Sequence, residues 1–405
     1  MRLVDELKAR GLIDQMTYPE ELEKKLNDEK IVFYAGFDCT ADSLTVGHYF
    51  LLTQMKRLQN AGHIPICLIG GGTTLVGDPS GRDEMRQLMG NDFIDHNAQR
   101  FESQLRRFLE LDGTKGMVLN NRDWLTKLNF LDFVRDIGVH YNVNRMLTFD
   151  CYQNRMKDGL TFFEFSYMLM QGYDFLRLYR DHHCILQIGG SDQWSNMLGG
   201  YELVRKIEQD KVYCLTFPLL ARADGVKMGK SMGGAVWLDE EKTSPYDLYQ
   251  YFRNRDDSQI EQMLKALTFL PLEEIERIVK EEHINRQKEI LAYEITKDIH
   301  GKEKADQAIE TARSLFGGGN NLENMPSFEL PKEEVKDGIG LLHLLTKSGL
   351  CSSNSEGRSL VQQGGISMDD EKIEDPRYQV SVEELEKGFI LRKGKKKYLK
   401  IKLQS

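Results

Sequence analysis

The sequence has no apolar run that approaches the roughly 18 residues of a membrane-spanning helix, which excludes anchoring by such a helix. Residues 1–10 are polar and of mixed charge, and they lack the apolar core of a signal peptide. Cysteine is scarce too, with six residues in 405, all far apart and none in a C-x-x-C pair. This scarcity argues against a zinc ribbon or a disulfide framework. We therefore expect a cytoplasmic protein with reduced, mostly buried thiols and no bound metal or prosthetic group.

Positive charge is also in short supply. Lys and Arg number 54 against 63 Asp and Glu, and the net charge of −9 excludes a basic, histone-like protein. The exception is the segment 387–402, which holds eight basic residues and no acidic one. Within it Leu399, Ile401 and Leu403 alternate with polar residues, which predicts a strand with one basic face. A basic terminal module on an acidic chain favours a polyanionic partner, and a solvated tail is the alternative.

The first 220 residues alternate short apolar runs with helical patterns. A helix is expected from about Val46 to Ala61, with Gly62 closing it. Strands are expected at Ile31–Phe37, Ile64–Gly71, Met117–Leu119, Cys184–Gly189 and Val212–Leu220. This order predicts a parallel α/β sheet. Ligands of such sheets bind beyond the carboxyl ends of the strands, where the strand order reverses.

Beyond Pro245 the pattern becomes helical. Amphipathic helices are expected at Asp256–Leu267, Leu272–Glu282, Arg286–Ile299 and Lys302–Leu315. A Gly- and Asn-rich stretch begins at Gly317 and marks a boundary. The predicted organisation is an α/β domain (1–220), a glycine-rich loop and connector (221–244), an all-α domain (245–316), a linker (317–337) and a small C-terminal domain (338–405).

Two segments that follow predicted strands carry candidate chemistry. Residues 38–48 lead into a helix, and the free N–H groups at a helix start attract phosphate. Gly47 has no side chain and would let a flat base approach the backbone, and His48 could donate to a phosphate oxygen. Residues 188–194 place two glycines before Asp192, which suits a ribose. Taken singly, each is also a common helix-start or loop composition.

A third segment, residues 227–231, offers two lysines in a glycine-rich stretch that could close over a triphosphate. In this order the three segments are far more specific than any one of them, and the chain resembles the bacterial tyrosyl-tRNA synthetases of class I. The HIGH-type signature reads Thr45-Val46-Gly47-His48, and the KMSKS-type signature is Lys227–Ser231.

The resemblance extends over nearly the whole chain. Gly77–Gly81 matches, and Phe162–Tyr179 is similar to the tyrosine-pocket helix of the family. Ser353–Ile366 and Gly394–Leu403 resemble an S4-type RNA-binding domain. The resemblance implies a Rossmann-like catalytic domain, an anticodon-side helical domain and a small α+β S4-type domain.

By the same resemblance the substrates are L-tyrosine, ATP with Mg²⁺, and the tyrosine tRNA. The enzyme would be a homodimer whose contact includes the segment around Phe162. Tyrosine carboxylate would attack the α-phosphorus of ATP and release pyrophosphate, and the tyrosyl group would then pass to the terminal ribose of the tRNA.

The resemblance also assigns site residues by position. Tyrosine would contact Tyr34, Asp78, Tyr167, Gln171, Asp174 and Gln193. The nucleotide would contact Gly36, Asp38, Thr45, Gly47, His48, Gly190, Asp192 and Lys230. Catalysis would rest on Thr40, His48, Arg82, Arg86, Lys227 and Lys230. The tRNA would contact Arg358, Lys393, Lys395, Lys396 and Lys397.

The tyrosine assignments make physical sense. A phenol needs both a donor and an acceptor nearby, which Tyr34 and Asp174 supply. Tyr167, Gln171 and Asp174 stand at i, i+4 and i+7, so a helix would present them on one face. Such a stripe is usually core, but Gln171 and Asp174 are unusual core residues.

Two positions depart from the family pattern. Thr45 replaces the first His of the HIGH signature, and Ala35 stands where relatives often carry a Cys that can touch the ribose. Threonine still serves as an N-cap, but it is shorter and never cationic. We expect tyrosine activation to be intact but less efficient than with His and Cys.

Three alternative functions fit the sequence less well. A tryptophan-specific relative is disfavoured by Tyr34 with Asp174, because an indole offers only a donor. A synthetase-like RNA-binding protein without activity is favoured only by Thr45. A generic Rossmann enzyme lacks the expected G-x-G-x-x-G after the first strand.

Overall fold

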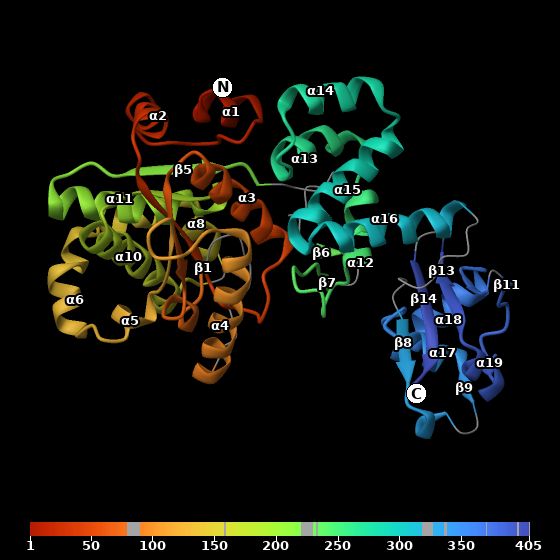
Figure 1. Cartoon of the computed structure of the whole chain (residues 1–405). Helices are drawn as coiled ribbons and strands as arrows, with labels where there is room; N and C mark the ends of the chain where they lie inside the picture. The colour runs from red at the N-terminus through yellow and green to blue at the C-terminus, as the bar shows by residue number, and fades with distance from the viewer. Residues whose placement is uncertain are drawn as a thin grey trace. The chain divides into compact units, whose positions relative to one another are not determined.

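The computed structural model describes residues 1–78, 90–157, 159–219, 230–231, 234–317, 327–335, 338–369, 371–394 and 397–404 (Figure 1). The chain forms two compact units. The first contains residues 1–230, 235–239 and 255–287, and the second contains 231–234, 240–254 and 288–405. The predicted helical domain 245–316 is therefore divided, since its residues 255–287 group with the α/β part.

The first unit is built on a parallel sheet whose strands run in the order β3-β2-β1-β4-β5 across the described residues. The bounds are β1 Val32–Phe37, β2 Ile64–Ile69, β3 Met117–Asn120, β4 Cys184–Gly190 and β5 Tyr213–Phe217. Every one of these strands lies within or overlaps a predicted run, so the parallel α/β prediction is confirmed. The strands could be predicted from apolar runs because a sheet that is covered on both faces carries apolar side chains on both faces.

The strand order reverses between β1 and β4, which are neighbours in the sheet although 147 positions separate Phe37 at the end of β1 from Cys184 at the start of β4. In their register Tyr34 is the partner of Gln187, so the two side chains share one face. At the opposite end of the sheet, residues 14–17 run antiparallel to β5. Thr216 donates its N–H to the Gln15 carbonyl, and Thr17 donates to the Cys214 carbonyl.

Helices cover both faces of this sheet. Figure 1 shows α10 (Tyr167–His182) and α11 (Trp194–Glu208) on one side, and α3 (Val46–Asn60) and α4 (Asn91–Phe108) on the other. The predicted helix 46–61 is confirmed as α3, and Gly62 follows it at φ +101°, a conformation that glycine adopts without strain. Tyr34 packs with Phe175 and Met197 in the core between the sheet and α10–α11.

Shorter helices complete the first unit. They are α1 Leu3–Ala9, α2 Pro19–Asp28, α5 Arg122–Leu125, α6 Phe130–Asp136, α7 Val143–Met146, α8 Asp150–Met156, α9 Phe162–Phe165, α13 Ile260–Leu267 and α14 Leu272–Glu281. The last two confirm the helices predicted over 256–267 and 272–282.

The second unit combines helices with a small mixed sheet. Its helices are α12 Pro245–Arg253, α16 Lys302–Gly317, α17 Leu341–Lys347, α18 Asn354–Gln362 and α19 Val382–Lys387, and α15 Ile284–His300 begins in the first unit. The sheet order is β11-β10-β13-β14-β8, with bounds β8 Ser327–Leu330, β10 Ile366–Met368, β11 Glu371–Lys372, β13 Phe389–Lys393 and β14 Lys397–Leu403. The predicted terminal strand is confirmed, since Leu399, Ile401 and Leu403 pack into the domain core.

One part of the predicted linker 317–337 is not a linker. Residues 327–330 form β8, which pairs in parallel with β14, and Leu330 is fully buried. Pro331, one of the two prolines that suggested a linker, directly follows the strand, where a missing N–H breaks no hydrogen bond within it. Pro326 lies outside the described residues.

All six cysteines are buried free thiols, as predicted: Cys39, Cys67, Cys151, Cys184, Cys214 and Cys351. No helix in the described part of the chain is long and apolar enough to cross a membrane.

Candidate active site

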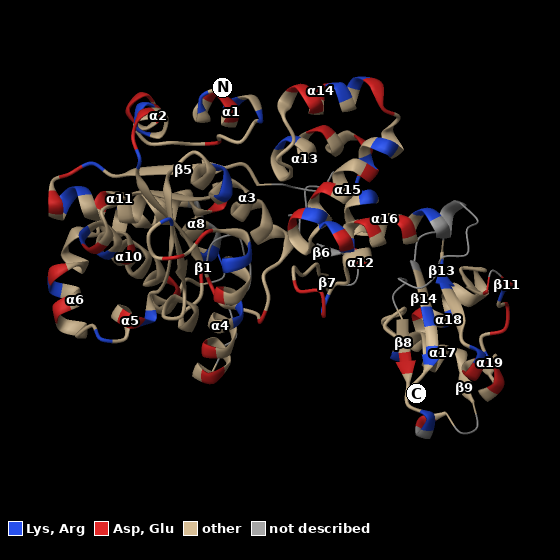
Figure 2. Cartoon of the chain, viewed as in Figure 1, with Lys and Arg blue, Asp and Glu red and all other residues tan. Residues whose placement is uncertain are grey.

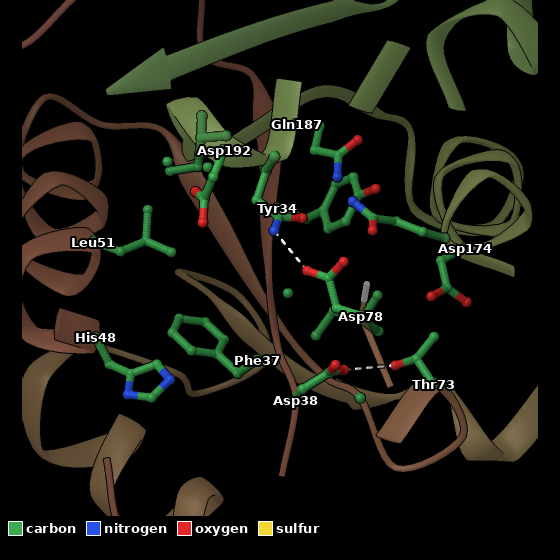
Figure 3. A pocket seen from close by; sticks show the side chains of 18 of the residues that line it. Tyr34, Phe37, Asp38, His48, Leu51, Thr73, Asp78, Asp174, Gln187 and Asp192 are labelled. Carbon is green, nitrogen blue, oxygen red and sulfur yellow. Dashed lines mark hydrogen bonds between the residues drawn. The ribbon is translucent and has the colours of Figure 1, made fainter. Parts of the chain in front are cut away.

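A cavity of about 310 Å³ lies at the carboxyl ends of β1 and β4, where the strand order reverses. That is the position that the sheet rule predicts. Figure 3 shows the side chains of Tyr34, Asp78, Asp174 and Asp192 gathered around it. The described lining residues include the predicted Tyr34, Gly36, Asp38, Gly47, His48, Asp78, Tyr167, Gln171, Asp174, Gly190, Asp192 and Gln193.

Tyr34 and Asp174 form the deepest part of the wall. Tyr34 is 1 % exposed, and its hydroxyl has no hydrogen-bond partner in the described structure. Asp174 is buried and accepts a bond on each carboxylate oxygen, 2.9 Å from Asn121 Nδ2 and 2.7 Å from Trp124 Nε1. Burial raises the pKa of Asp174 to about 7, against the opposing effect of these two donors. A buried hydroxyl without a partner is costly, so a ligand that bonds it would be favoured.

Two glutamines present further acceptors to the same cavity. Gln171 on α10 and Gln187 on β4 both have a buried Oε1 atom without a partner among the described residues. Gln171 was predicted, but Gln187 was missed. The sequence did point to Gln187, because a polar residue inside an apolar central strand rarely lacks a binding or structural partner.

A second polar group surrounds Asp78. Gln193 Nε2 donates to Asp78 Oδ2 at 2.7 Å, and Asn196 Nδ2 donates to Oδ1 at 3.1 Å. Asp38 is held in a similar way by Thr73 Oγ1 at 2.9 Å and by the Tyr167 hydroxyl at 3.2 Å. These bonds fix two carboxylates in the wall with their negative charge available to a cationic group.

His48 lines the other side of the cavity, in the first turn of α3. Its Nδ1 lies 3.0 Å from the backbone N of Thr45, which donates to it. Burial lowers the pKa of His48 to about 4, so the ring is neutral at pH 7. With Nδ1 accepting, the ring proton resides on Nε2, which remains a donor for a ligand.

Two glycines shape the nucleotide side. A Cβ atom at Gly36 would meet nothing within 4 Å, so this position opens onto the cavity. A Cβ atom at Gly190 would lie 2.8 Å from Asp192 Oδ1. Glycine at 190 therefore keeps room for the carboxylate of Asp192.

Other predicted residues are placed differently. Thr40, Thr45 and Ala35 are not part of the described wall, and Ala35 is fully buried in the sheet. Thr45 reaches the cavity only through His48. Lys230 belongs to the two-residue strand β6 (Lys230–Ser231), which pairs with β7 (Gly234–Ala235). Arg82, Arg86 and Lys227 lie outside the described residues.

Asn121 and Trp124 were also missed by the sequence reasoning. Both follow β3, at the same sheet edge as the other site residues. The rule that located the other segments therefore applied to them as well, but their composition alone gave no chemical signal.

The charge of the described wall is one-sided. Asp38, Asp78, Asp174 and Asp192 line it, and none of its described residues is Lys or Arg. In the described chain no three His, Cys, Asp or Glu side chains are placed to hold a metal ion. The arrangement suits a ligand with a cationic group and several hydroxyls.

The predicted tRNA-contact residues all fall in the C-terminal domain. Arg358 is exposed on α18. Lys393 Nζ instead bonds Glu356 Oε1 at 2.5 Å and the Leu350 carbonyl at 2.9 Å. Lys397 begins β14, and Lys395 and Lys396 lie outside the described residues. Figure 2 shows Lys and Arg along β13 and β14.

Comparison with known proteins identifies the family. Residues 26–317 match the family model of the class I tRNA synthetases for tryptophan and tyrosine, and residues 319–401 match the tyrosine–tRNA ligase SYY-like C-terminal domain. The tyrosine–tRNA ligase of Acetivibrio thermocellus is 50 % identical over 400 residues, covering 98 % of each chain. The chain belongs to the tyrosyl-tRNA synthetase family.

Other members of the family support the same conclusion. Tyrosine–tRNA ligase 1 of Clostridium acetobutylicum is 47 % identical over 403 residues, again with 98 % of each chain covered. The C-terminally truncated mitochondrial tyrosyl-tRNA synthetase of Aspergillus nidulans has a similar structure, with a TM-score of 0.70 and 31 % identity. The match covers 78 % of this chain and 94 % of that one. The prediction of a tyrosyl-tRNA synthetase is therefore confirmed at the level of the family.

Proposed function

We propose that this chain is a tyrosine–tRNA ligase that activates L-tyrosine with ATP and transfers it to the tyrosine tRNA. The single observation that carries the choice of amino acid is the unpartnered Tyr34 hydroxyl in the wall that Asp174 also lines. A phenol placed there can donate to Asp174 and accept from Tyr34. Phenylalanine would leave the Tyr34 hydroxyl unpaired and would give Asp174 no donor beyond Asn121 and Trp124, and an indole could satisfy only the acceptor.

The ammonium group of tyrosine would lie at Asp78. Gln193 and Asn196 hold that carboxylate in place, and Tyr167 and Gln171 complete the acceptor side of the cavity. An ammonium offers three donors and needs acceptors around it. The two ends of the amino acid are thus recognised by different elements, which fixes its carboxylate toward the nucleotide side.

ATP would bind over Gly36, Gly47 and His48, with its ribose at Gly190 and Asp192. A carboxylate oxygen of tyrosine attacks the α-phosphorus, an O–P bond forms, and the bond to the β-phosphate oxygen breaks as pyrophosphate leaves. The transferred group carries its negative charge on phosphate oxygens, so catalysis depends on positioning and on charge stabilisation. His48 Nε2 supplies a neutral donor, and Arg82, Arg86, Lys227 and Lys230 would supply the cations. Mg²⁺ would enter with ATP as part of the substrate.

Amino-acid-dependent exchange of pyrophosphate into ATP tests the first step directly. Tyrosine, phenylalanine and tryptophan are compared in parallel, and we expect exchange with tyrosine alone. Exchange with tryptophan would contradict the amino-acid assignment. No exchange at all, combined with retained tRNA binding, would instead favour a synthetase-like RNA-binding protein.

The tRNA and a second copy of the chain complete the proposal. The α17–α18 region and the basic strand β14 would bind tRNA, with Arg358 as a contact, and the chain would act in the cytoplasm. Several large apolar side chains are exposed on neighbouring segments of the first unit: Phe130, Leu131, Val134, Val139, Val143, Met156 and Phe162. Phe162 is 70 % exposed, which favours a homodimer whose contact includes the segment around it. Phe162→Asp should shift sedimentation from dimer to monomer, and an unchanged dimer would refute the placement of the contact.

A further inference from the structure

The C-terminal end of helix α13 is bonded almost entirely by side chains. Its cap residue Thr268 is extended, with φ −118° and ψ 159°. The last carbonyls of a helix have no partner within it and need one from elsewhere. Here each carbonyl from Leu264 to Thr268 accepts a bond from a side chain.

Most of these donors come from helix α3. The Tyr49 hydroxyl bonds the Leu267 carbonyl at 3.2 Å, and Gln54 Nε2 bonds the Ala266 carbonyl at 3.1 Å. Arg57 Nη2 bonds the Thr268 carbonyl and lies 3.4 Å from that of Lys265. All three side chains are buried.

Helix α1 supplies the remaining arginine. Arg10, 4 % exposed, donates to the carbonyls of Lys265 at 3.0 Å and Leu270 at 2.8 Å. Glu6 Oε1 lies 2.7 Å from Arg10 and 3.6 Å from Arg57, so one carboxylate faces both guanidinium groups. Arg57 also stacks 4.7 Å above the Phe269 ring. Arg57 is therefore held by a carboxylate, a ring and two carbonyls, a degree of fixation that a solvent-facing arginine lacks.

The other end of α3 is tied as well. Val46 donates its N–H to the Val236 carbonyl at 3.0 Å, and Leu238 donates to the Leu44 carbonyl at 2.8 Å. Residues 236–238 are thus the last that contact the start of α3 before the chain continues into residues 240–254 of the second unit. The chain contacts α3 again at α13. Both ends of that excursion are anchored on the one helix that presents Gly47 and His48 to the cavity.

We propose that Arg57 is a positioning residue for the nucleotide end of α3, acting through the helix rather than by touching ATP. A helix is stiff along its axis, and Val46 and Arg57 are about 16 Å apart at 1.5 Å per residue. A change at the Arg57 end therefore shifts or tilts His48 and Gly47. The tyrosine end of the cavity, built on β1 and α10, is not attached to this clamp. The inference rests on the proposed function, since its readout is use of ATP.

Arg57→Met tests it, because methionine keeps an apolar stem and removes all the hydrogen bonds of the guanidinium. In tyrosine-dependent pyrophosphate exchange we expect the KM for ATP to rise about tenfold, while the KM for tyrosine stays close to that of the parent. Arg57→Lys should restore part of the loss, since one ammonium can still reach one carbonyl. Tyr49→Phe removes only the bond to Leu267 and supplies a milder variant if Arg57→Met does not fold.

Gln59→Met is the matched control. Gln59 also lies on α3 and also bonds carbonyls, those of Glu110 at 2.8 Å and Lys115 at 3.1 Å, but these are not on α13. The Gln59→Met variant should have a lower melting temperature, without a selective rise in the KM for ATP. The inference is overturned if Arg57→Met and Tyr49→Phe leave the KM for ATP unchanged, or raise both KM values equally. A parent chain without any exchange would defeat the proposed function itself, which is a separate result.

Discussion

Gln193 and Asp78 lie 115 positions apart in the chain, yet the Nε2 of Gln193 donates to Oδ2 of Asp78 at 2.7 Å. The bond joins the segment after β4 to the segment after β2. Asn196 occupies the other carboxylate oxygen, so Asp78 has a fixed orientation before any ligand arrives. A carboxylate held in this way recognises an ammonium without having to reorganise first.

Asp78→Asn should raise the KM for tyrosine about tenfold or more, because a hydrogen bond to a charged group is stronger than a neutral one. Inhibition constants then locate the effect. Tyrosinol keeps the ammonium and should bind the variant more weakly, while 3-(4-hydroxyphenyl)propionate lacks it and should bind no worse. Equal weakening of both inhibitors would place Asp78 elsewhere than at the ammonium. Asp112→Asn, which alters only a surface turn, serves as the control.

Tyr34→Phe should lower the preference for tyrosine over phenylalanine in kcat/KM about fivefold to tenfold. The same change removes a buried hydroxyl that has no partner, so the ligand-free variant should melt no lower than the parent. Tyr152→Phe is the contrasting variant, because the Tyr152 hydroxyl bonds the Phe165 carbonyl at 2.8 Å outside the cavity wall. It should melt lower and keep the parent's preference. An unchanged preference in Tyr34→Phe would remove Tyr34 from phenol recognition.

The raised pKa of Asp174 predicts a pH-dependent stability. Its folded pKa of about 7 lies above the ordinary aspartate value of 3.8, so between these values the folded chain keeps a proton that the unfolded chain has lost. The contribution of Asp174 to stability is therefore present at low pH and declines as pH rises toward 7. The Asn side chain of Asp174→Asn cannot titrate. As pH rises across this window, the free energy of unfolding of the variant should therefore increase relative to that of the parent by up to about 1.4 kcal/mol per pH unit. Urea unfolding at a series of pH values measures the difference, and parallel curves for the two proteins would contradict it.

Gly36→Ala and Gly70→Ala should separate binding from folding. The added methyl at 36 meets nothing within 4 Å, so the variant should fold normally but should raise the KM for ATP by occupying the cavity. At Gly70 the added carbon would lie 2.6 Å from Thr73 Oγ1 and closer still to Asp38. That variant should lose about 1–3 kcal/mol of stability. Thermal melting and exchange kinetics on both proteins test this, and a destabilised Gly36→Ala would show that the position is more crowded than the structure indicates.

The sequence supported the sheet and most of the site, for reasons that can be traced to particular residues. Buried parallel strands need apolar residues on both faces, so all five strand positions were readable as runs. Tyr167, Gln171 and Asp174 were assigned by the family resemblance, and the assignment was supported because Gln171 and Asp174 are unusual residues for a core stripe. Asn121 and Trp124 could not be read in this way, since their role depends on the approach of Asp174 from α10, more than 49 positions away.

The division of the helical segment 245–316 between the two units could not be predicted from the sequence either. Helices α13 and α14 have the same amphipathic pattern as α16, and periodicity does not say which partner a helix packs against. The attachment of α13 to α3 and to the end of α1 depends on Arg57, Gln54 and Arg10, which are polar residues that sequence reasoning would assign to the surface. For Ala35 the expected effect on ATP has lost its support, because the residue is buried away from the cavity wall.

Strand β8 has a practical consequence for dissecting the chain. A C-terminal fragment that starts at residue 338 would lack Ser327–Leu330 and would leave unpaired the backbone groups by which Lys400–Leu403 of β14 bond β8. An uncovered strand edge of this kind invites pairing with another molecule. Fragments meant to report RNA affinity should therefore begin before Ser327, or their measured binding will be confounded by self-association.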